Sequence, residues 1–172
     1  MAATPEDTLI IETSRGPVTV QLRPDLAPNH VARIKELARQ GFYDGVVFHR
    51  VIDGFMAQTG DPTGTGTGGS SYPDLPAEFT NKATFERGTI GAARSNDPNS
   101  ANSQFFIDFD AAPSLNGNYT IWGQVIDGMG AVDKINPGEP PPFPDKIVKM
   151  QVAADADDAS KAAATKVLKA QQ

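Results

Sequence analysis

One short stretch of the chain combines side chains that could bind and polarise a peptide. Arg50 interrupts the apolar run VVFHRVI, and Phe55, Met56 and Gln58 follow it within nine residues. Arginine is permanently charged and donates hydrogen bonds in a rigid fork, so it needs acceptors or water when apolar neighbours surround it. The combination predicts a surface that is part apolar and part hydrogen-bonding.

Short strands must position these side chains. Gly54 breaks the apolar run, so residues 55–58 are interpreted as a short strand with Phe55 and Ala57 on one face and Met56 and Gln58 on the other. Phe105 and Phe106 are consecutive and must point to opposite faces of a strand, with Gln104 on the face of Phe106. Apolar alternation predicts the remaining strands within residues 8–13, 17–22, 88–94, 118–125 and 146–154, the last of which returns to the first hairpin.

Two helices are expected. In the first, Asp25 lies in the cap region, Pro28 suits the first turn, and Gly41 ends the helix. Its apolar face carries Val31, Ile34, Leu37 and Ala38. A second helix is predicted from Met129 to Ile135 by the spacing of apolar residues.

Length and composition limit the class of protein. The 172 residues suit one domain, 1–154, followed by a tail, 155–172, which is rich in alanine and lysine and could be helical. A net charge of −6 argues against nucleic-acid binding, and no apolar run reaches membrane-spanning length. The absence of cysteine excludes disulfides and thiol chemistry. No leader is visible, so we expect a cytoplasmic protein; a periplasmic location stays open, because a removed leader would leave no trace.

Several familiar site types are excluded by context. Gly64, Gly66 and Gly69 match the dinucleotide pattern G-x-G-x-x-G, but prolines follow where that motif requires a helix. His30 and His49 alone are too few ligands for a metal site, so we expect neither metal nor cofactor. No serine lies in a nucleophile-elbow context, which argues against a serine hydrolase.

The order and spacing of longer motifs carry a resemblance. FHRVIDGFMAQTGDPTGTGTGG, GTIGAAR, SQFFI and LNGNYTIWGQV together resemble the cyclophilin family of peptidyl-prolyl cis-trans isomerases in its bacterial form, over residues 8–153. The resemblance implies a mainly β fold, a closed eight-stranded antiparallel β-barrel capped by two α-helices. It also implies catalysed rotation about X-Pro bonds in proline-containing peptides and unfolded proteins, which would assist protein folding.

The resemblance assigns roles to individual residues. Arg50 would be the catalytic donor, and Gln58 would hold Arg50 or the substrate carbonyl. The proline ring would contact an apolar pocket, and Gln104 would bind the substrate backbone. The pocket residues would be Phe55, Met56, Phe106 and Leu115, and the groove would be bordered by Ala93, Arg94, Ser95 and Tyr119.

Three positions depart from the eukaryotic pattern of that family. Ser114 stands where the pattern has a tryptophan that supports tight binding of the cyclic peptide cyclosporin, so weak cyclosporin binding is expected. Tyr119 replaces a histidine and Arg94 an asparagine, and neither change removes the arginine or the pocket. A closed barrel leaves no long sheet edge, which favours a monomer.

A second interpretation comes from a different class. The same groove could serve as a binding module for proline peptides or as a holdase for unfolded chains. Arg50 and Gln58 favour the enzyme, because simple binding has no special need for a donor that acts on the transition state.

Overall fold

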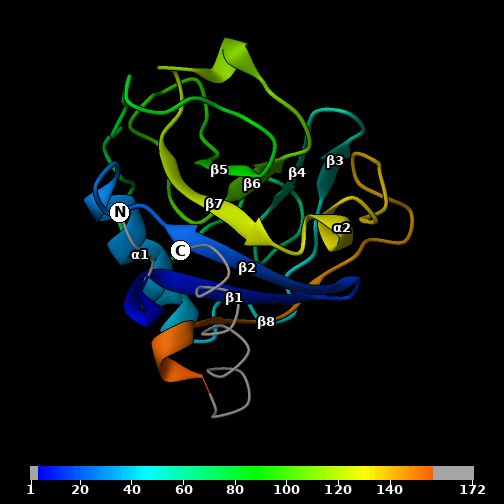
Figure 1. Cartoon of the computed structure of the whole chain (residues 1–172). Coiled ribbons are helices and arrows are strands. Elements are labelled where there is room, and N and C mark those ends of the chain that lie inside the picture. The colour runs from blue at the N-terminus through cyan, green and yellow to red at the C-terminus, as the bar shows by residue number, and fades with distance from the viewer. Residues whose placement is uncertain (1–3, 157–172) are drawn as a thin grey trace.

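The computed structural model describes residues 4–156 (Figure 1). In it, the strands with alternating apolar residues form one antiparallel sheet. Its order is β3-β4-β6-β5-β7-β2-β1-β8. The strands are β1 (Thr8–Thr13), β2 (Gly16–Leu22), β3 (Arg50–Ile52), β4 (Met56–Thr59), β5 (Thr89–Ala92), β6 (Phe105–Asp108), β7 (Ile121–Asp127) and β8 (Ile147–Val152). The α-helices are α1 (Pro28–Arg39) and α2 (Met129–Val132), and the 3-10 turns are η1 (Pro5–Asp7), η2 (Pro113–Leu115) and η3 (Ala153–Asp155).

The predicted hairpin and the return of the last strand are confirmed. Leu9 of β1 pairs with Val20 of β2 on one side and with Val152 of β8 on the other, both antiparallel. Strands from the two ends of the sequence are therefore neighbours in one half of the sheet, and the site strands β3 to β6 occupy the other half.

The ends of the sheet approach each other without a regular ladder. Within residues 4–156, β3 and β8 are the terminal strands, and an isolated bridge joins Val47 to Lys146. The amide of Phe48 donates to the carbonyl of Asp145, and the amide of Ile147 donates to that of Val46, both at 2.8 Å. The structure is an eight-stranded antiparallel half-barrel, and full closure of the barrel stays a prediction.

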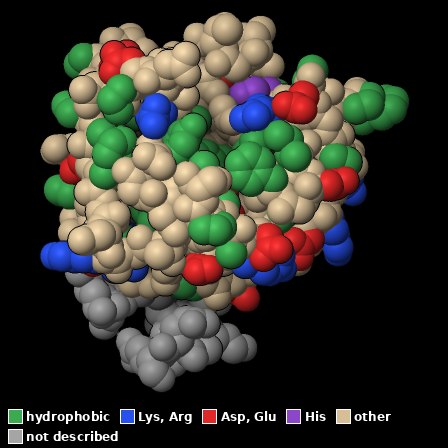
Figure 2. All heavy atoms as spheres, turned by 90° about the horizontal axis from the view of Figure 1, so that it is seen from above, with side chains coloured by type: hydrophobic (Ala, Val, Ile, Leu, Met, Phe, Trp, Pro, Cys, Tyr) green, Lys and Arg blue, Asp and Glu red, His purple; other side chains and the backbone are tan. Residues whose placement is uncertain are grey.

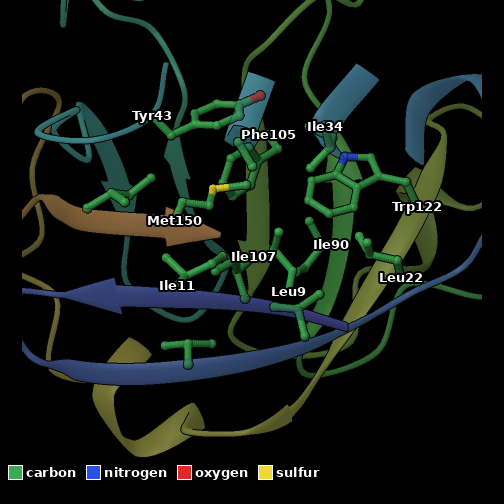
Figure 3. Close-up of a cluster of buried hydrophobic side chains, with 14 of the residues drawn as sticks. Leu9, Ile11, Leu22, Ile34, Tyr43, Ile90, Phe105, Ile107, Trp122 and Met150 are labelled. Atoms are coloured by element: carbon green, nitrogen blue, oxygen red, sulfur yellow. The ribbon is translucent and has the colours of Figure 1, made fainter. Parts of the chain in front are cut away.

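The main core fills the concave side of the curled sheet (Figure 3). Side chains of β1, β6 and β8 converge there, among them Ile11, Ile107 and Met150. Phe105 makes edge-on ring contacts with Tyr43 at 5.6 Å and with Trp122 at 5.3 Å between centroids. These large buried rings stabilise the strand that also carries Phe106.

The apolar face of α1 covers this core, but its N-terminus is capped differently from the prediction. The cap position is Ala27, which offers no side-chain acceptor, and Asp25 instead pairs with Arg23 at 2.9 Å. The carboxylate of Glu78 accepts hydrogen bonds from the amides of Asn29 and His30 at 3.2 and 2.8 Å. A residue distant in sequence therefore satisfies the first free amides of the helix.

Helix α2 is shorter than the predicted span. It ends at Val132, and the amides of Lys134 and Ile135 then donate to the carbonyls three residues earlier. These bonds tighten the chain into 3-10 turns. The predicted tail helix lies largely in residues 157–172, outside the described part. No helix among residues 4–156 is long and apolar enough to span a membrane.

Candidate active site

A second apolar cluster lies on the face of the sheet opposite the main core. Its buried members are Met56, Phe85, Phe106, Ala112, Leu115 and Ile121. Gln58 is paired with Phe106 in the β4–β6 ladder, so Met56, Gln58 and Phe106 share one face. Phe105 packs in the main core and Phe106 in the second cluster, which confirms that the two rings point in opposite directions.

This cluster forms the floor of a cavity of about 200 Å³. Nearly all the site residues expected from the sequence line it: Arg50, Phe55, Met56, Gln58, Ala93, Arg94, Phe106, Leu115 and Tyr119. Ser95 and Gln104 line an adjoining cavity of about 570 Å³ that shares Gln58, Ala93 and Arg94 with the first. In Figure 2, hydrophobic side chains gather on this face of the molecule, with basic side chains on either side.

Phe55 lies on a different side from the one predicted. It packs against the second cluster with Met56, whereas Ala57 is in the main core. Strand β4 begins at Met56, and Phe55 belongs to a turn in which its amide donates to Ile52 at 3.0 Å after Gly54 at φ +73°. The alternation of a strand does not extend into that turn, so the expected grouping of Phe55 with Ala57 is wrong.

Hydrogen bonds between side chains orient the polar wall of the cavity. Arg50 Nη1 donates to Gln58 Oε1 at 3.4 Å, and Gln58 Nε2 donates to Gln104 Oε1 at 2.9 Å. Gln104 Nε2 in turn donates to the carbonyls of Gly66 and Gly68, each at 3.0 Å. Each amide is therefore held in one orientation, and the arginine lies at the end of a fixed chain of donors and acceptors.

The glycine-rich loop holds this chain by folding around a buried carboxylate. Asp61 Oδ2 accepts from the amides of Gly66 and Gly68 at 2.7 and 3.0 Å, and Oδ1 accepts from Thr63 at 2.8 Å. Burial alone would raise the pKa of Asp61, but these donors outweigh burial and lower it to about 2. A Cβ on Gly68 would lie 2.2 Å from Asp61 Oδ1, so the glycine is required there.

The side chain of Arg94 lines the cavity together with Arg50. The resemblance had also allowed Arg94 to act through its backbone groups alone. Its guanidinium stacks 4.5 Å from the centre of the Tyr119 ring and donates to the carbonyl of Asn118 at 3.0 and 2.7 Å. Tyr119 makes an edge-on contact with Phe106 at 5.8 Å. The rim is thus a stack that is continuous with the floor of the cavity.

Sequence reasoning missed Glu139. Its Oε1 accepts a hydrogen bond from Arg50 Nε at 3.0 Å, although the two residues are 89 positions apart. The segment around Glu139, GEPPPFPD, has the composition of a stiff connector, and nothing in its local pattern indicates a partner. Only the fold brings it to the site.

Among residues 4–156, no group of three or more His, Cys, Asp or Glu side chains is placed to hold a metal ion. His49 is buried beside the site, and burial lowers its pKa despite the carboxylate of Asp61 nearby. His30, in the first turn of helix α1, is buried and contacts Glu78 at 2.6 Å. Both histidines belong to the packed structure.

Comparison with known proteins agrees with this geometry. Residues 8–152 match the family described as "Cyclophilin type peptidyl-prolyl cis-trans isomerase/CLD". A probable peptidyl-prolyl cis-trans isomerase of Brucella suis is 56% identical over 170 residues, which cover 90% of this chain and 86% of the relative. The chain also matches a solved structure of cyclophilin AquaCyp293 from Hirschia baltica with a TM-score of 0.84 and 28% identity, over 92% of this chain and 78% of that one.

A second solved structure adds a ligand to the comparison. It is a cyclophilin-type peptidyl-prolyl cis-trans isomerase of Cryptosporidium parvum, studied in the presence of the dipeptide Ala-Pro, with a TM-score of 0.79 and 30% identity. The match covers 84% of this chain and 98% of that one. The family match, the identity to the Brucella protein and the shared fold show that the chain belongs to the cyclophilin-type peptidyl-prolyl cis-trans isomerases.

Proposed function

We propose that the chain accelerates rotation about X-Pro bonds by holding the proline ring in the 200 Å³ cavity and donating from Arg50 to the proline nitrogen. The observation that carries this proposal is the position of Arg50 on the polar wall of a cavity whose floor is apolar. Phe55, Met56, Phe106 and Leu115 supply the apolar surface. A proline ring has no polar group of its own, so such a surface suits it.

The chemistry needs no nucleophile. Rotation about the bond has a barrier near ~20 kcal/mol because the nitrogen lone pair is delocalised into the carbonyl. In the twisted transition state the lone pair returns to the nitrogen, which becomes basic. A fixed cationic donor at that point stabilises the transition state more than either planar ground state. An acceleration of about 10⁵-fold would require roughly 7 kcal/mol from the donor, the pocket and desolvation together.

The polar wall supports the second half of the proposal, which concerns the rest of the peptide. Gln58 holds Arg50, so we assign it a catalytic role through that contact. Gln104 and Ser95 lie where the adjoining cavity would receive residues beside the proline. The side-chain amide of Gln104 already donates to the carbonyls of Gly66 and Gly68. To bind the backbone of the substrate, Gln104 would have to exchange those hydrogen bonds.

The ligand class follows from the same surface. The Ala-Pro dipeptide of the Cryptosporidium parvum study supports proline-containing peptides as ligands here, and we extend this to unfolded proteins and to assistance in folding. Ser114 is exposed beside Leu115 of the cavity and offers little apolar contact, which supports weak cyclosporin binding. Three expectations from the sequence stay predictions: that the protein is a monomer, that its barrel is closed and that it acts in the cytoplasm. The described residues expose three large hydrophobic side chains, Phe79, Phe143 and Val148, and these come from three separate segments.

NMR exchange between the cis and trans forms of a short Ala-Pro peptide tests the proposal. The intact protein and Arg50→Ala are compared at matched peptide occupancy, with Arg87→Ala as a control that removes an arginine of similar exposure, which does not line the cavity. We expect fast exchange in the intact protein and the control, and loss of exchange with retained binding in Arg50→Ala. Binding without accelerated exchange in the intact protein would indicate a recognition module instead.

A further inference from the structure

We propose that Glu139 is a positioning residue that fixes the guanidinium of Arg50 for its work in the cavity. The inference rests on the proposed role of Arg50 as donor. Glu139 Oε1 accepts from Arg50 Nε at 3.0 Å, and Gln58 Oε1 accepts from Nη1 at 3.4 Å. The hydrogen bond to Gln58 is long, and its acceptor is a neutral amide oxygen. Glu139 supplies the shorter bond, in which both the donor and the acceptor are charged.

The two acceptors leave one nitrogen for the substrate. A guanidinium is planar and rigid, so hydrogen bonds at two different nitrogens determine where the third one points. Within residues 4–156, Arg50 Nη2 has no hydrogen-bond acceptor. Arg50 lines the cavity, and its side chain is 45% exposed. Without its two hydrogen-bond acceptors, this side chain would sample other rotamers. Glu139 therefore restricts the donor before the peptide binds.

The backbone places Glu139 where this contact is possible. Val51 and Gly138 form an antiparallel bridge, with the amide of Val51 donating to Gly138 at 2.8 Å and that of Gly138 donating back at 2.9 Å. This register sets Glu139 opposite Arg50, the arrangement in which side chains of neighbouring strands meet. Gly138 has φ +146°, and a Cβ there would lie 2.5 Å from Pro141 Cα, so the bridge depends on glycine.

The base of the same loop is tied to the sheet. Asp145 accepts from the amide of Asn136 at 2.8 Å and from Ser14 Oγ at 2.7 Å, and it pairs with Arg15 at 2.9 Å. Asn136 Nδ2 also donates to the carbonyl of Phe143 at 2.8 Å across the loop. The segment from 136 to 145 is therefore a braced loop that presents a carboxylate at a set position.

The pair contributes to positioning rather than to folding. The side chains of Arg50 and Glu139 are 45% and 58% exposed, and ion pairs at such positions add little to stability. Substitution at Glu139 should leave the melting temperature unchanged, so a change in turnover can be separated from unfolding.

The experiment compares Glu139→Ala and Glu139→Gln with the intact protein in the Ala-Pro exchange assay. We expect Glu139→Ala to lower kcat roughly two- to fivefold, the size of coupling measured for exposed pairs, with KM unchanged. Glu139→Gln keeps an oxygen acceptor and should retain most of the rate. In ¹⁵N spectra, the Arg50 Nε–Hε signal should shift and broaden in Glu139→Ala and recover in Glu139→Gln in parallel with turnover, a correlation that a merely structural role would not produce.

Asp133→Ala is the matched control, because it breaks an equally exposed ion pair with Arg87 at 2.7 Å that does not line the cavity. It should leave both kcat and the Arg50 signal unchanged. Unchanged or raised turnover in Glu139→Ala would overturn the inference. So would a loss of turnover on adding Glu139→Ala to Arg50→Ala, since Glu139 would then act without the arginine. Full turnover by Arg50→Ala alone would overturn the donor role and this inference together.

Discussion

Replacing Asp108 with asparagine is expected to stabilise the protein at neutral and alkaline pH and to have little effect in acid. Asp108 lies in β6 opposite Met56, a residue that lines the 200 Å³ cavity, and it is fully buried. Neither of its carboxyl oxygens has a hydrogen-bond partner in the structure of residues 4–156. Burial therefore raises its pKa from 3.8 to about 7.

The sign and size follow from linkage between protonation and folding. The folded protein holds the proton more tightly than the unfolded chain, so stability is full below the unfolded pKa of 3.8 and falls as pH rises toward about 7. The pKa difference is about three units, and each unit corresponds to about 1.36 kcal/mol, so the loss reaches about 4 kcal/mol near and above pH 7. That is a large part of the 5–15 kcal/mol typical of a domain. Asparagine has nearly the same shape and no charge to bury.

Urea unfolding at pH 4, 6 and 8 measures the effect. The free energy of unfolding of Asp108→Asn should match that of the intact protein at pH 4 and exceed it progressively at pH 6 and 8. Asp110→Asn, which changes an exposed carboxyl two residues later, serves as the control for charge alone. Equal stabilisation at every pH, or a loss of stability at pH 8, would refute the reasoning, because the carboxylate would then have a partner that the geometry does not show.

Two further predictions concern the loop and the rim. Asp61→Asn should lower the free energy of unfolding by about 2 kcal/mol at pH 7, because it leaves buried amides without a charged acceptor. It should also lower turnover, because the carbonyl of Gly68 in the same loop accepts from Gln104. An unchanged melting temperature would contradict this prediction. The contribution of Asp61 is present above pH 3.8 and is lost as pH falls through about 2, so in acid titrations the variant and the intact protein should converge in stability there. Ser114→Trp should tighten cyclosporin binding by about tenfold or more through added apolar contact, which titration calorimetry would measure, and no gain would argue that the rim is shaped against the ligand.

The sequence by itself determined the strands and most of the site. Residues 50–58 and 104–106 carry patterns that act over a few positions, and alternation within a strand is set by local backbone geometry. For that reason the opposite orientations of Phe105 and Phe106 could be predicted without the fold. The longer motifs identified the family, and with it the arginine and its pocket.

Only the tertiary structure decided which charges meet and which are left alone. Glu139 reaches Arg50 because an isolated bridge sets the register of a loop 89 positions away, and Glu78 caps α1 from 48 positions away. Asp61 and Asp108 are both buried aspartates in or next to short strands. Amides donate to Asp61, whereas the carboxyl of Asp108 has no hydrogen-bond partner among the described residues, so their pKa values move in opposite directions. Desolvation and pairing depend on every segment that packs around a group, and no local pattern contains that information.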